Sequence, residues 1–370
     1  MNVVGCILGP LLAGFLFLPL LSERWVLFVF ALPWLAVGLS PAWAAKTGRI
    51  IPTRARRSSY ALALVAIVLL ALGRDYAARF HHHVLLRDHT ATIIAAGEGM
   101  KRQLFVNGIG ITVLTPATKM MAHLPLASLD HAPKNALAIC FGMGTSFRSL
   151  LSWNIPVTAV ELVPSVPKVF WYFHSDAPEL LASPLAHVVI DDGRRYLERT
   201  NEQFDVITID PPPPVEAAGS SLLYSKEFYA TLKARLRTGG ILQQWLPHGD
   251  QVDDAAVSRA IQESFPYVRV FWENPEKHWG THFIASVEPL HNWTAAELAQ
   301  HMPDKASADL IEWGPQLDAE RQFAALMANE VPIKDLIEEA PGTPALRDDK
   351  PVNEYYLLRR RVLPVVKQYF

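Results

Sequence analysis

The sequence predicts an α/β fold built on a doubly wound, largely parallel β-sheet with helices on both faces. Two observations predict it. Short apolar runs alternate with amphipathic stretches from Asn135 onward, and the apolar runs are nearly continuous rather than alternating with polar residues. Such runs are typical of parallel strands buried on both faces. We expect strands at 136–141, 157–163, 187–190, 206–209, 241–245, 268–272 and 282–287, with helices at 145–153, 193–199, 225–236 and 253–265.

A small β-hairpin domain is expected before the sheet, over residues 84–125. Its sequence TATIIAAGEGMKRQLFVNGIGITVL alternates apolar and polar residues around the turn signals GEG and NG. Alternation with a period of two is typical of half-buried strands, and NG between such strands predicts a hairpin. The sheet domain then covers residues 126–290. Residues 291–370 form a helical C-terminal extension to which the sequence assigns no chemistry.

Three apolar runs precede these domains, within a membrane segment of residues 1–80. The expected helices cover about 3–21, 25–45 and 58–76. A spanning helix needs about 20 apolar residues, so the first two runs are long enough, whereas the third spans only with help from its flanks. We therefore expect two or three transmembrane helices in an integral, multi-pass protein of the inner membrane.

The basic loop between the second and third runs orients the segment. It carries Lys46, Arg49, Arg54, Arg56 and Arg57, which places it in the cytoplasm. If the third run spans the membrane, the sheet domain faces outward. If that run lies in the interface, the domain faces the cytoplasm.

Charge and cysteine content exclude some functions. The formal net charge is −2, which gives no reason to expect nucleic-acid binding. Cys6 and Cys140 lie in apolar runs without the spacing of a metal or redox site, so we expect buried, unreactive thiols and no metal.

Small and acidic residues follow the first three predicted strands. Gly142 and Gly144 in FGMGTS allow a tight turn and the close approach of a ligand. Glu161 ends the second strand, where a carboxylate can bind ribose hydroxyls. After the third strand, Asp191 or Asp192 could accept a hydrogen bond from an adenine amino group, although capping of the next helix explains either residue equally well.

The fourth strand ends at Asp210, and four prolines follow in FDVITIDPPPP. Ligands of open α/β sheets bind beyond the carboxyl ends of the strands. The glycine loop, Glu161, the Asp191–Asp192 pair and Asp210 all lie at such ends. Proline fixes φ and cannot donate a backbone hydrogen bond, so the run would hold the carboxylate rigidly over a pocket. A rigid loop that merely ends the strand is the alternative. Gly219 and the serines after it would let the loop move.

Together these motifs resemble the spermidine synthases (polyamine aminopropyltransferases), which have the class I methyltransferase, Rossmann-like fold. The matching segments are FGMGTS, AVELV, DDGRRYL, IDPPPP, LYSKEFY and LRTGGIL. The resemblance implies that S-adenosylmethionine or its decarboxylated form is the co-substrate. It makes Asp210 the catalytic aspartate, and the implied donor contacts are Gly142, Gly144, Glu161, Asp192 and Gly193, with Asp191 as the competing candidate.

The ending LRDDKPVNEYYLLRR resembles the tail of a membrane-fused branch of that family. Two other motifs of this chain differ from the family pattern. The second aspartate of D-x-x-D-P, which binds the polyamine, falls on Pro213, and Y-[QH]-E falls on residues 117–119. A polyamine needs several carboxylates to replace its hydration, so a product other than spermidine is expected. Glu216 and Tyr224 are the candidate contacts for the amine.

The leading hypothesis is a membrane-anchored transferase that moves an aminopropyl or other alkyl group to a small-molecule amine, with Asp210 as the base. An alternative is an S-adenosylmethionine-dependent N-methyltransferase, because DPPP resembles the [DN]-P-P-[YFW] loop of such enzymes. A third hypothesis is a catalytically silent, membrane-anchored nucleoside-binding module. A donor made in the cytoplasm favours a cytoplasmic sheet domain, and the family's dimers imply a possible homodimer.

Overall fold

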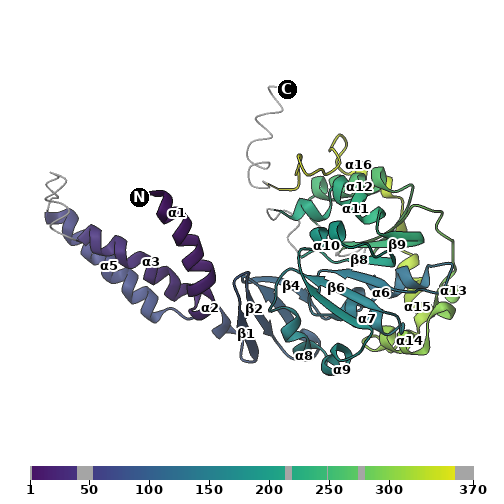
Figure 1. Ribbon diagram of the computed structural model, residues 1–370, viewed down its shortest axis with the longest axis horizontal. Helices are drawn as coiled ribbons and strands as arrows, with labels where there is room; N and C mark the ends of the chain where they lie inside the picture. Colours follow the sequence, from purple (N-terminus) through teal and green to yellow (C-terminus); the bar gives the residue numbers. More distant parts are fainter. Residues whose placement is uncertain (1, 40–52, 213–218, 248, 274–279, 355–370) are drawn as a thin grey trace. The chain divides into compact units, whose positions relative to one another are not determined.

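The computed structural model describes residues 2–39, 53–212, 219–247, 249–273 and 280–354 (Figure 1). These residues form two compact units. The first is Met1–Gly97 with Phe105–Ile109, and the second is Glu98–Leu104 with Gly110–Phe370.

The first unit begins with apolar helices. Helix α1 (Asn2–Leu11) continues through a π-helical stretch, η1 (Leu12–Phe17), into α2 (Leu18–Leu20), and α3 (Glu23–Leu39) and α5 (Thr53–Leu72) follow. Within the described residues, one helix is long and apolar enough to cross a membrane, Val3–Leu20, and none of it is buried. Helices therefore form at all three predicted runs, but one span is supported rather than two or three.

The remaining two helices fall short for different reasons. Helix α3 is described over 17 residues, and the rest of the predicted second span lies outside the described residues. Helix α5 has three arginines in its first two turns, which leaves Tyr60–Leu72 as its apolar part, shorter than a span. The prediction of a multi-pass protein is therefore not supported. Cys6 on α1 is exposed, so the prediction that it is buried is wrong.

The predicted hairpins form a four-stranded sheet in the order β1-β2-β3-β4. Its strands are β1 (His83–Arg87), β2 (Thr92–Ala96), β3 (Gln103–Val106) and β4 (Ile109–Val113). At the NG signal, Asn107 and Gly108 both have positive φ, 52° and 80°, as the tight turn of a hairpin requires. Within the first unit, Ile94, Ala96 and Phe105 are buried together with Ala77.

The second unit contains the predicted α/β sheet, in the order β12-β10-β11-β9-β8-β5-β6-β7. Five strands are parallel, and the three at one edge are antiparallel, so the sheet is mixed. The bounds are β5 (Ala136–Ile139), β6 (Val157–Glu161), β7 (Ala186–Ile190), β8 (Phe204–Ile209), β9 (Leu236–Leu246), β10 (Tyr267–Trp272), β11 (Thr281–Ser286) and β12 (Glu330–Val331).

Helices cover both faces of this sheet (Figure 1). One face carries α10 (Gly193–Arg199), α11 (Lys226–Lys233) and α12 (Gln251–Ser264), and the other carries α6 (Pro116–Ala127) and α7 (Thr145–Leu151). The largest core cluster lies between the sheet and α11 and α12, where Ile209, Phe228 and Ala256 are fully buried. Shorter helices lie between strands: α8 (Phe170–Phe173) and α9 (Ala177–Leu181).

The C-terminal extension is helical as predicted, through α13 (Ala295–His301), α14 (Asp304–Ile311), α15 (Ala319–Met327) and α16 (Ile333–Glu338). An ion cluster, defined as Lys119, His123, Arg148, Asp309 and Glu312, attaches α14 to α6 and α7. Lys119, His123 and Asp309 are buried, Arg148 is half-buried and Glu312 is exposed. Asp309 lies at its centre and accepts hydrogen bonds from Lys119, from His123 at 2.9 Å, and from Arg148. Lys119 is fully buried. The boundaries of the four predicted domains stay a prediction.

Candidate functional site

The carboxyl ends of the parallel strands bring three predicted acidic residues around one thiol. Cys140 follows β5 with a left-handed φ of 73°, which ends that strand at Ile139 rather than at the predicted Phe141. Burial raises the pKa of the Cys140 thiol well above its ordinary value, and the negative charges of Glu161, Asp210 and Asp192 raise it further. Glu161, Asp192 and Asp210 thus lie near one another at the carboxyl ends of β6, β7 and β8, next to the end of β5. The thiol stays protonated, as expected of an unreactive cysteine.

The glycine loop after β5 has two glycines that are needed for different reasons. Gly142 has a φ of 54°, and a β-carbon there would meet only a methyl group of Thr112, at 3.9 Å. Gly144 has a φ of 79°, and a β-carbon there would lie 2.4 Å from the Phe170 ring. Gly144 thus allows close packing inside the protein. Gly142 leaves open space beside the backbone, as a ligand would require.

Glu161 is buried at the end of β6, and both of its oxygens accept backbone hydrogen bonds. One accepts from the amide of Phe141 and the other from the amide of Val163, each at 2.9 Å. Burial raises the pKa of this carboxyl, and the backbone amides partly oppose the rise. The amides of Gly142 and Leu162 also stabilise the charged form, so backbone amides of the glycine loop and of the loop after β6 orient this carboxylate at the strand end.

The sequence left open whether Asp191 and Asp192, in the loop after β7, bind a ligand or cap the next helix. Asp192 caps α10 by accepting a hydrogen bond from the amide of Arg195 at 2.8 Å. Asp191 accepts from the amide of Asp192 and forms an ion pair with Arg195 at 3.0 Å. A β-carbon on Gly193 would lie 2.5 Å from Ile139, so glycine lets this loop pack on β5. Asp191 is therefore committed to an arginine, whereas Asp192 is exposed and faces the Cys140 side of the site.

Asp210 follows β8, and its amide donates to the carbonyl of Ile139 at 3.3 Å. Burial raises the pKa of its carboxyl to about 7. No side chain or amide of the described residues donates a hydrogen bond to this carboxylate. A carboxyl group with a pKa near neutrality and no partner of its own is suited to accept a proton from a substrate. Pro213 and Glu216 lie outside the described residues.

Tyr224 lies near the end of β8, because Gln244 donates to the carbonyl of Leu223 and pairs in the sheet with Ile209, the residue before Asp210. Its side chain is buried, and its hydroxyl has no hydrogen-bond partner among the described residues. Burial raises the pKa of the hydroxyl well above its ordinary value, with smaller contributions from Tyr229 and Asp210. Buried polar groups are nearly always satisfied, so an unpartnered hydroxyl near the end of β8 is expected where a ligand completes the site.

The sequence interpretation missed a row of polar residues that crosses three strands and ends just beyond a fourth. Thr208 on β8 donates to Gln243 on β9, whose side-chain amide donates to His282 on β11 at 3.4 Å. The other ring nitrogen of His282 lies 3.1 Å from Glu273, just beyond β10. Consecutive glutamines in an otherwise apolar strand, Gln243 and Gln244, were the available signal, because buried amides need partners.

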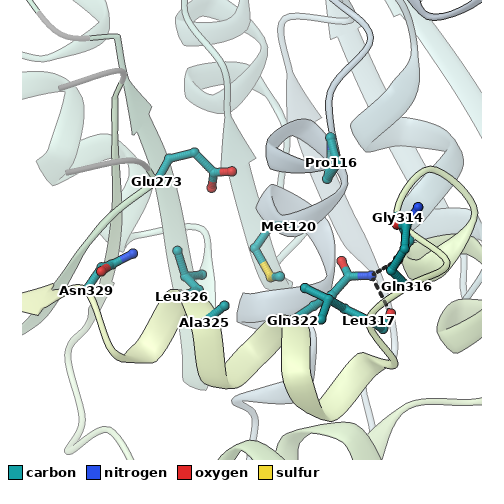
Figure 2. A pocket seen from close by; sticks show the side chains of 10 residues that line it. All are labelled: Pro116, Met120, Glu273, Gly314, Gln316, Leu317, Gln322, Ala325, Leu326 and Asn329. Atoms are coloured by element: carbon teal, nitrogen blue, oxygen red, sulfur yellow. Dashed lines mark hydrogen bonds between the residues drawn. The ribbon is translucent and has the colours of Figure 1, made fainter. Parts of the chain in front are cut away.

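Glu273 also opens onto a pocket of about 230 Å3 between α6 and the C-terminal extension. Figure 2 shows its carboxylate pointing toward Met120 across a mainly apolar space. The lining residues are Pro116, Met120, Glu273, Gly314, Gln316, Leu317, Gln322, Ala325, Leu326 and Asn329. Nowhere in the described ranges do three or more histidine, cysteine or acidic side chains gather as metal ligands would.

The fold and the strand-end residues can be compared with known proteins. Residues 115–274 match the family model of the spermine/spermidine synthase domain. Over 192 residues the chain is 28% identical to polyamine aminopropyltransferase 2 of Pseudomonas aeruginosa, which covers 48% of this chain and 54% of the relative. It is 32% identical over 149 residues to the polyamine aminopropyltransferase of Korarchaeum cryptofilum, covering 39% of this chain and 46% of the relative. The chain thus spans about half the length of these curated relatives.

Solved structures support the same fold. Spermidine synthase from Thermotoga maritima superposes with a TM-score of 0.54 at 19% identity, covering 70% of this chain and 87% of that one. A spermidine synthase in complex with the transition-state analogue AdoDATO gives a TM-score of 0.52, also at 19% identity, with the same coverage. The expected combination of a small antiparallel sheet and a larger α/β sheet is confirmed.

Proposed function

We propose that this chain, which is similar to the polyamine aminopropyltransferases of the spermine/spermidine synthase family, transfers an aminopropyl group from decarboxylated S-adenosylmethionine to an amine. The observation that carries the proposal is the position of Asp210 at the carboxyl end of β8, where no described residue donates a hydrogen bond to its carboxylate. Burial there raises the pKa of the carboxyl to about 7. Tyr224, whose hydroxyl is unpartnered within the described residues, also lies near the end of β8, which supports a substrate site there.

The reaction needs one proton acceptor. The amine nitrogen attacks the propyl carbon bonded to sulfur, the carbon–sulfur bond breaks, and methylthioadenosine leaves as a neutral thioether. The new ammonium gives its proton to Asp210, which also orients the nitrogen lone pair before attack. A partly desolvated site favours the loss of the sulfonium charge during the reaction.

We propose that Gly142, Glu161 and Asp192 bind the donor, and that Gly144 and Gly193 let the two loops pack closely enough to form its site. Glu161 is fixed by backbone amides, so its carboxylate is already oriented for ribose hydroxyls. Gly142 leaves the space for the donor. Asp192 faces the same site and is exposed, whereas Asp191 is paired with Arg195 and holds the loop.

The acceptor that we propose carries fewer positive charges than a polyamine. Lys119 occupies part of the segment where the family has Y-[QH]-E, and it is buried and bonded to Asp309 and Glu312. A lysine cannot replace a carboxylate as a partner for a cationic amine. Tyr224, with the sequence-predicted Glu216, remains the proposed acceptor contact.

Donor binding tests this proposal and separates it from the N-methyltransferase alternative. Calorimetry on the full chain in detergent would compare decarboxylated S-adenosylmethionine, S-adenosylmethionine and methylthioadenosine. Tightest binding of the decarboxylated donor is expected. Preference for the carboxylated donor, S-adenosylmethionine, would favour the N-methyltransferase alternative. The DPPP segment of this chain resembles a loop of those enzymes. Absence of binding by all three nucleosides would contradict a donor site at the strand ends.

We also propose that Val3–Leu20 anchors the protein in the inner membrane with the second unit in the cytoplasm, where the donor is made. Its large apolar side chains are exposed, which suits contact with lipid. Removal of residues 2–20 should release the chain into the soluble fraction. A truncated chain that stays in the membrane pellet after alkaline washing would contradict a single anchor. Homodimer formation stays a prediction.

A further inference from the structure

The last described segment of the chain, Leu346–Glu354, binds across two loops of the candidate site, and we name it the C-terminal clamp. Its first residue is anchored in the core. Leu346 is fully buried, and its carbonyl accepts a hydrogen bond from the amide of Lys226 at 3.0 Å. The position of the clamp is therefore fixed relative to the start of α11.

Asp348 joins the loop after β7 to the loop after β8. Its two oxygens accept hydrogen bonds from the guanidinium of Arg194 at 2.8 and 2.7 Å. One of them also accepts from the hydroxyl of Ser225 at 2.6 Å. Arg194 comes directly after Gly193, and Ser225 caps α11. A bidentate, charge-assisted pair is among the stronger and more directional polar contacts in proteins, so Asp348 fixes the spacing of the two loops.

Glu354 and Asn353 hold the loop after β8 at a second place. One oxygen of Glu354 accepts from the amide of Gly219 at 2.9 Å and from the hydroxyl of Ser221 at 2.6 Å. The side-chain amide of Asn353 donates to the hydroxyl of Ser220 at 2.9 Å. Three consecutive loop residues are thus bound by two consecutive residues of the clamp.

Tyr224 lies between these two attachments. The turn Gly219–Ser221 is held by Glu354, and Ser225 is held by Asp348. Between them the amide of Tyr224 donates to the carbonyl of Ser221 at 3.0 Å, and Gln244 on β9 donates to the carbonyl of Leu223 at 3.0 Å. The backbone around Tyr224 is therefore fixed by the sheet on one side and by the clamp on the other.

We propose that Asp348 and Glu354 are positioning residues, which act through Gly219–Ser225 to hold Tyr224 in place near the end of β8, where Gln244 binds Leu223 and pairs with Ile209, the residue before Asp210. This inference rests on the proposed function, since it takes Asp210 and Tyr224 as the reacting site. Neither clamp residue is proposed to touch the substrate. A small displacement of a positioned group costs an enzyme activity without unfolding it, which distinguishes this role from a purely structural one.

The test uses the full chain with Glu354→Ala, Glu354→Gln, Asp348→Asn and the control Glu338→Gln. Glu338 lies in the same extension, is exposed, and has a single ion pair, with Lys334 at 4.0 Å. Two readouts are measured for each variant: the rate of chymotrypsin cleavage within residues 219–229, and the kcat and KM of transfer. Melting temperatures identify any variant that fails to fold.

Glu354→Ala is expected to raise cleavage and to lower kcat by about tenfold, because the turn loses both of its bonds to the carboxylate. Donor affinity should change less than twofold. Glu354→Gln keeps an oxygen acceptor and should restore most of the activity, and Glu338→Gln should match the unmodified protein. Asp348→Asn should behave like Glu354→Ala, since an amide cannot accept both bonds from Arg194.

Unchanged cleavage in Glu354→Ala and Asp348→Asn would overturn the proposal, and so would increased cleavage with unchanged kcat. An unmodified chain without transfer activity would count against the proposed function instead. In that case increased cleavage in the two variants, but not in Glu338→Gln, would still support the clamp.

Discussion

The carboxylate of Glu161 accepts a hydrogen bond from the amide of Phe141 at 2.9 Å, which ties the end of β6 to the glycine loop after β5. One buried acidic side chain therefore shapes the loop and faces the proposed donor site. Substitution of Glu161 can therefore measure what this carboxylate contributes to donor binding.

Glu161→Gln should weaken donor binding by roughly tenfold or more. An amide offers one oxygen, so either Phe141 or Val163 would face an NH2 group and lose its partner, which costs about 1–3 kcal/mol. Calorimetry with decarboxylated S-adenosylmethionine checks this, with Glu179→Gln on exposed α9 as the control. Equal affinity in Glu161→Gln and the unmodified chain would remove Glu161 from the donor site.

Asp210→Asn should lower kcat by about 10²–10⁴-fold, the usual contribution of a positioned base, while donor affinity changes little. In the unmodified chain, activity should rise with pH through about 7, because the carboxylate form accepts the proton. A pH–rate profile tests the assignment. A profile that is flat from pH 5 to 8 would show that a group other than Asp210 limits the reaction.

The raised pKa of Asp210 also has a consequence for stability. The folded state holds this proton more tightly than the unfolded state, so the contribution of the group to stability is lost as pH rises from about 4 toward about 7. Asp210→Asn cannot ionise and should melt at a higher temperature than the unmodified chain at pH 8. At pH 4 the difference should vanish. An Asn variant that melts lower at pH 8 would contradict the desolvated carboxylate.

Asp309→Asn should destabilise the second unit by about 3–5 kcal/mol, since it removes the central anion from buried Lys119 and half-buried Arg148. Burial opposes ionisation of Asp309, but the hydrogen bond from His123 and the charge of Lys119 hold its pKa well below the ordinary value. Its contribution is therefore present above about pH 4 and lost as pH falls. Urea unfolding at pH 7 tests this, with exposed Glu320→Gln as the control. A loss below 1 kcal/mol would show that the cluster is energetically neutral.

Gly144→Ala should destabilise the fold more than Gly142→Ala. Both alanines would adopt a positive φ, at roughly 1–2 kcal/mol each. Only the methyl group at position 144 would collide with Phe170, which adds about 1–3 kcal/mol of overpacking. Thermal melts of the two variants compare them directly. Equal melting temperatures would contradict the packing assigned to Gly144.

Local sequence patterns predicted the parts of the fold that depend on local structure. The apolar runs became β5, β6 and β8, and NG became a tight turn with both residues at positive φ. Asp210 could be predicted as a site residue because a strand end and a proline run are both visible along the chain, and the structure places it after β8. Capping of α10 by Asp192 was one of two interpretations that the sequence itself left open.

Contacts between distant residues could not be predicted in this way. Lys119 and Asp309 lie 190 positions apart, and Ser221 and Glu354 lie 133 apart. Hydropathy reports that a residue is buried or exposed, but not which partner satisfies it. The left-handed conformation of Cys140 was also missed, because nothing in an apolar run marks a residue that turns the chain. The second and third predicted spans relied on composition alone.

Release of methylthioadenosine tests the central claim most directly. Decarboxylated S-adenosylmethionine would be incubated with the full chain and a panel of monoamines, diamines and polyamines, and the nucleoside product would be quantified at pH 8. The proposed chemistry predicts amine-dependent release of methylthioadenosine by the unmodified chain, and its loss in Asp210→Asn with the donor still bound. Equal release by both proteins, or no release with any amine while the donor binds, would contradict aminopropyl transfer by Asp210.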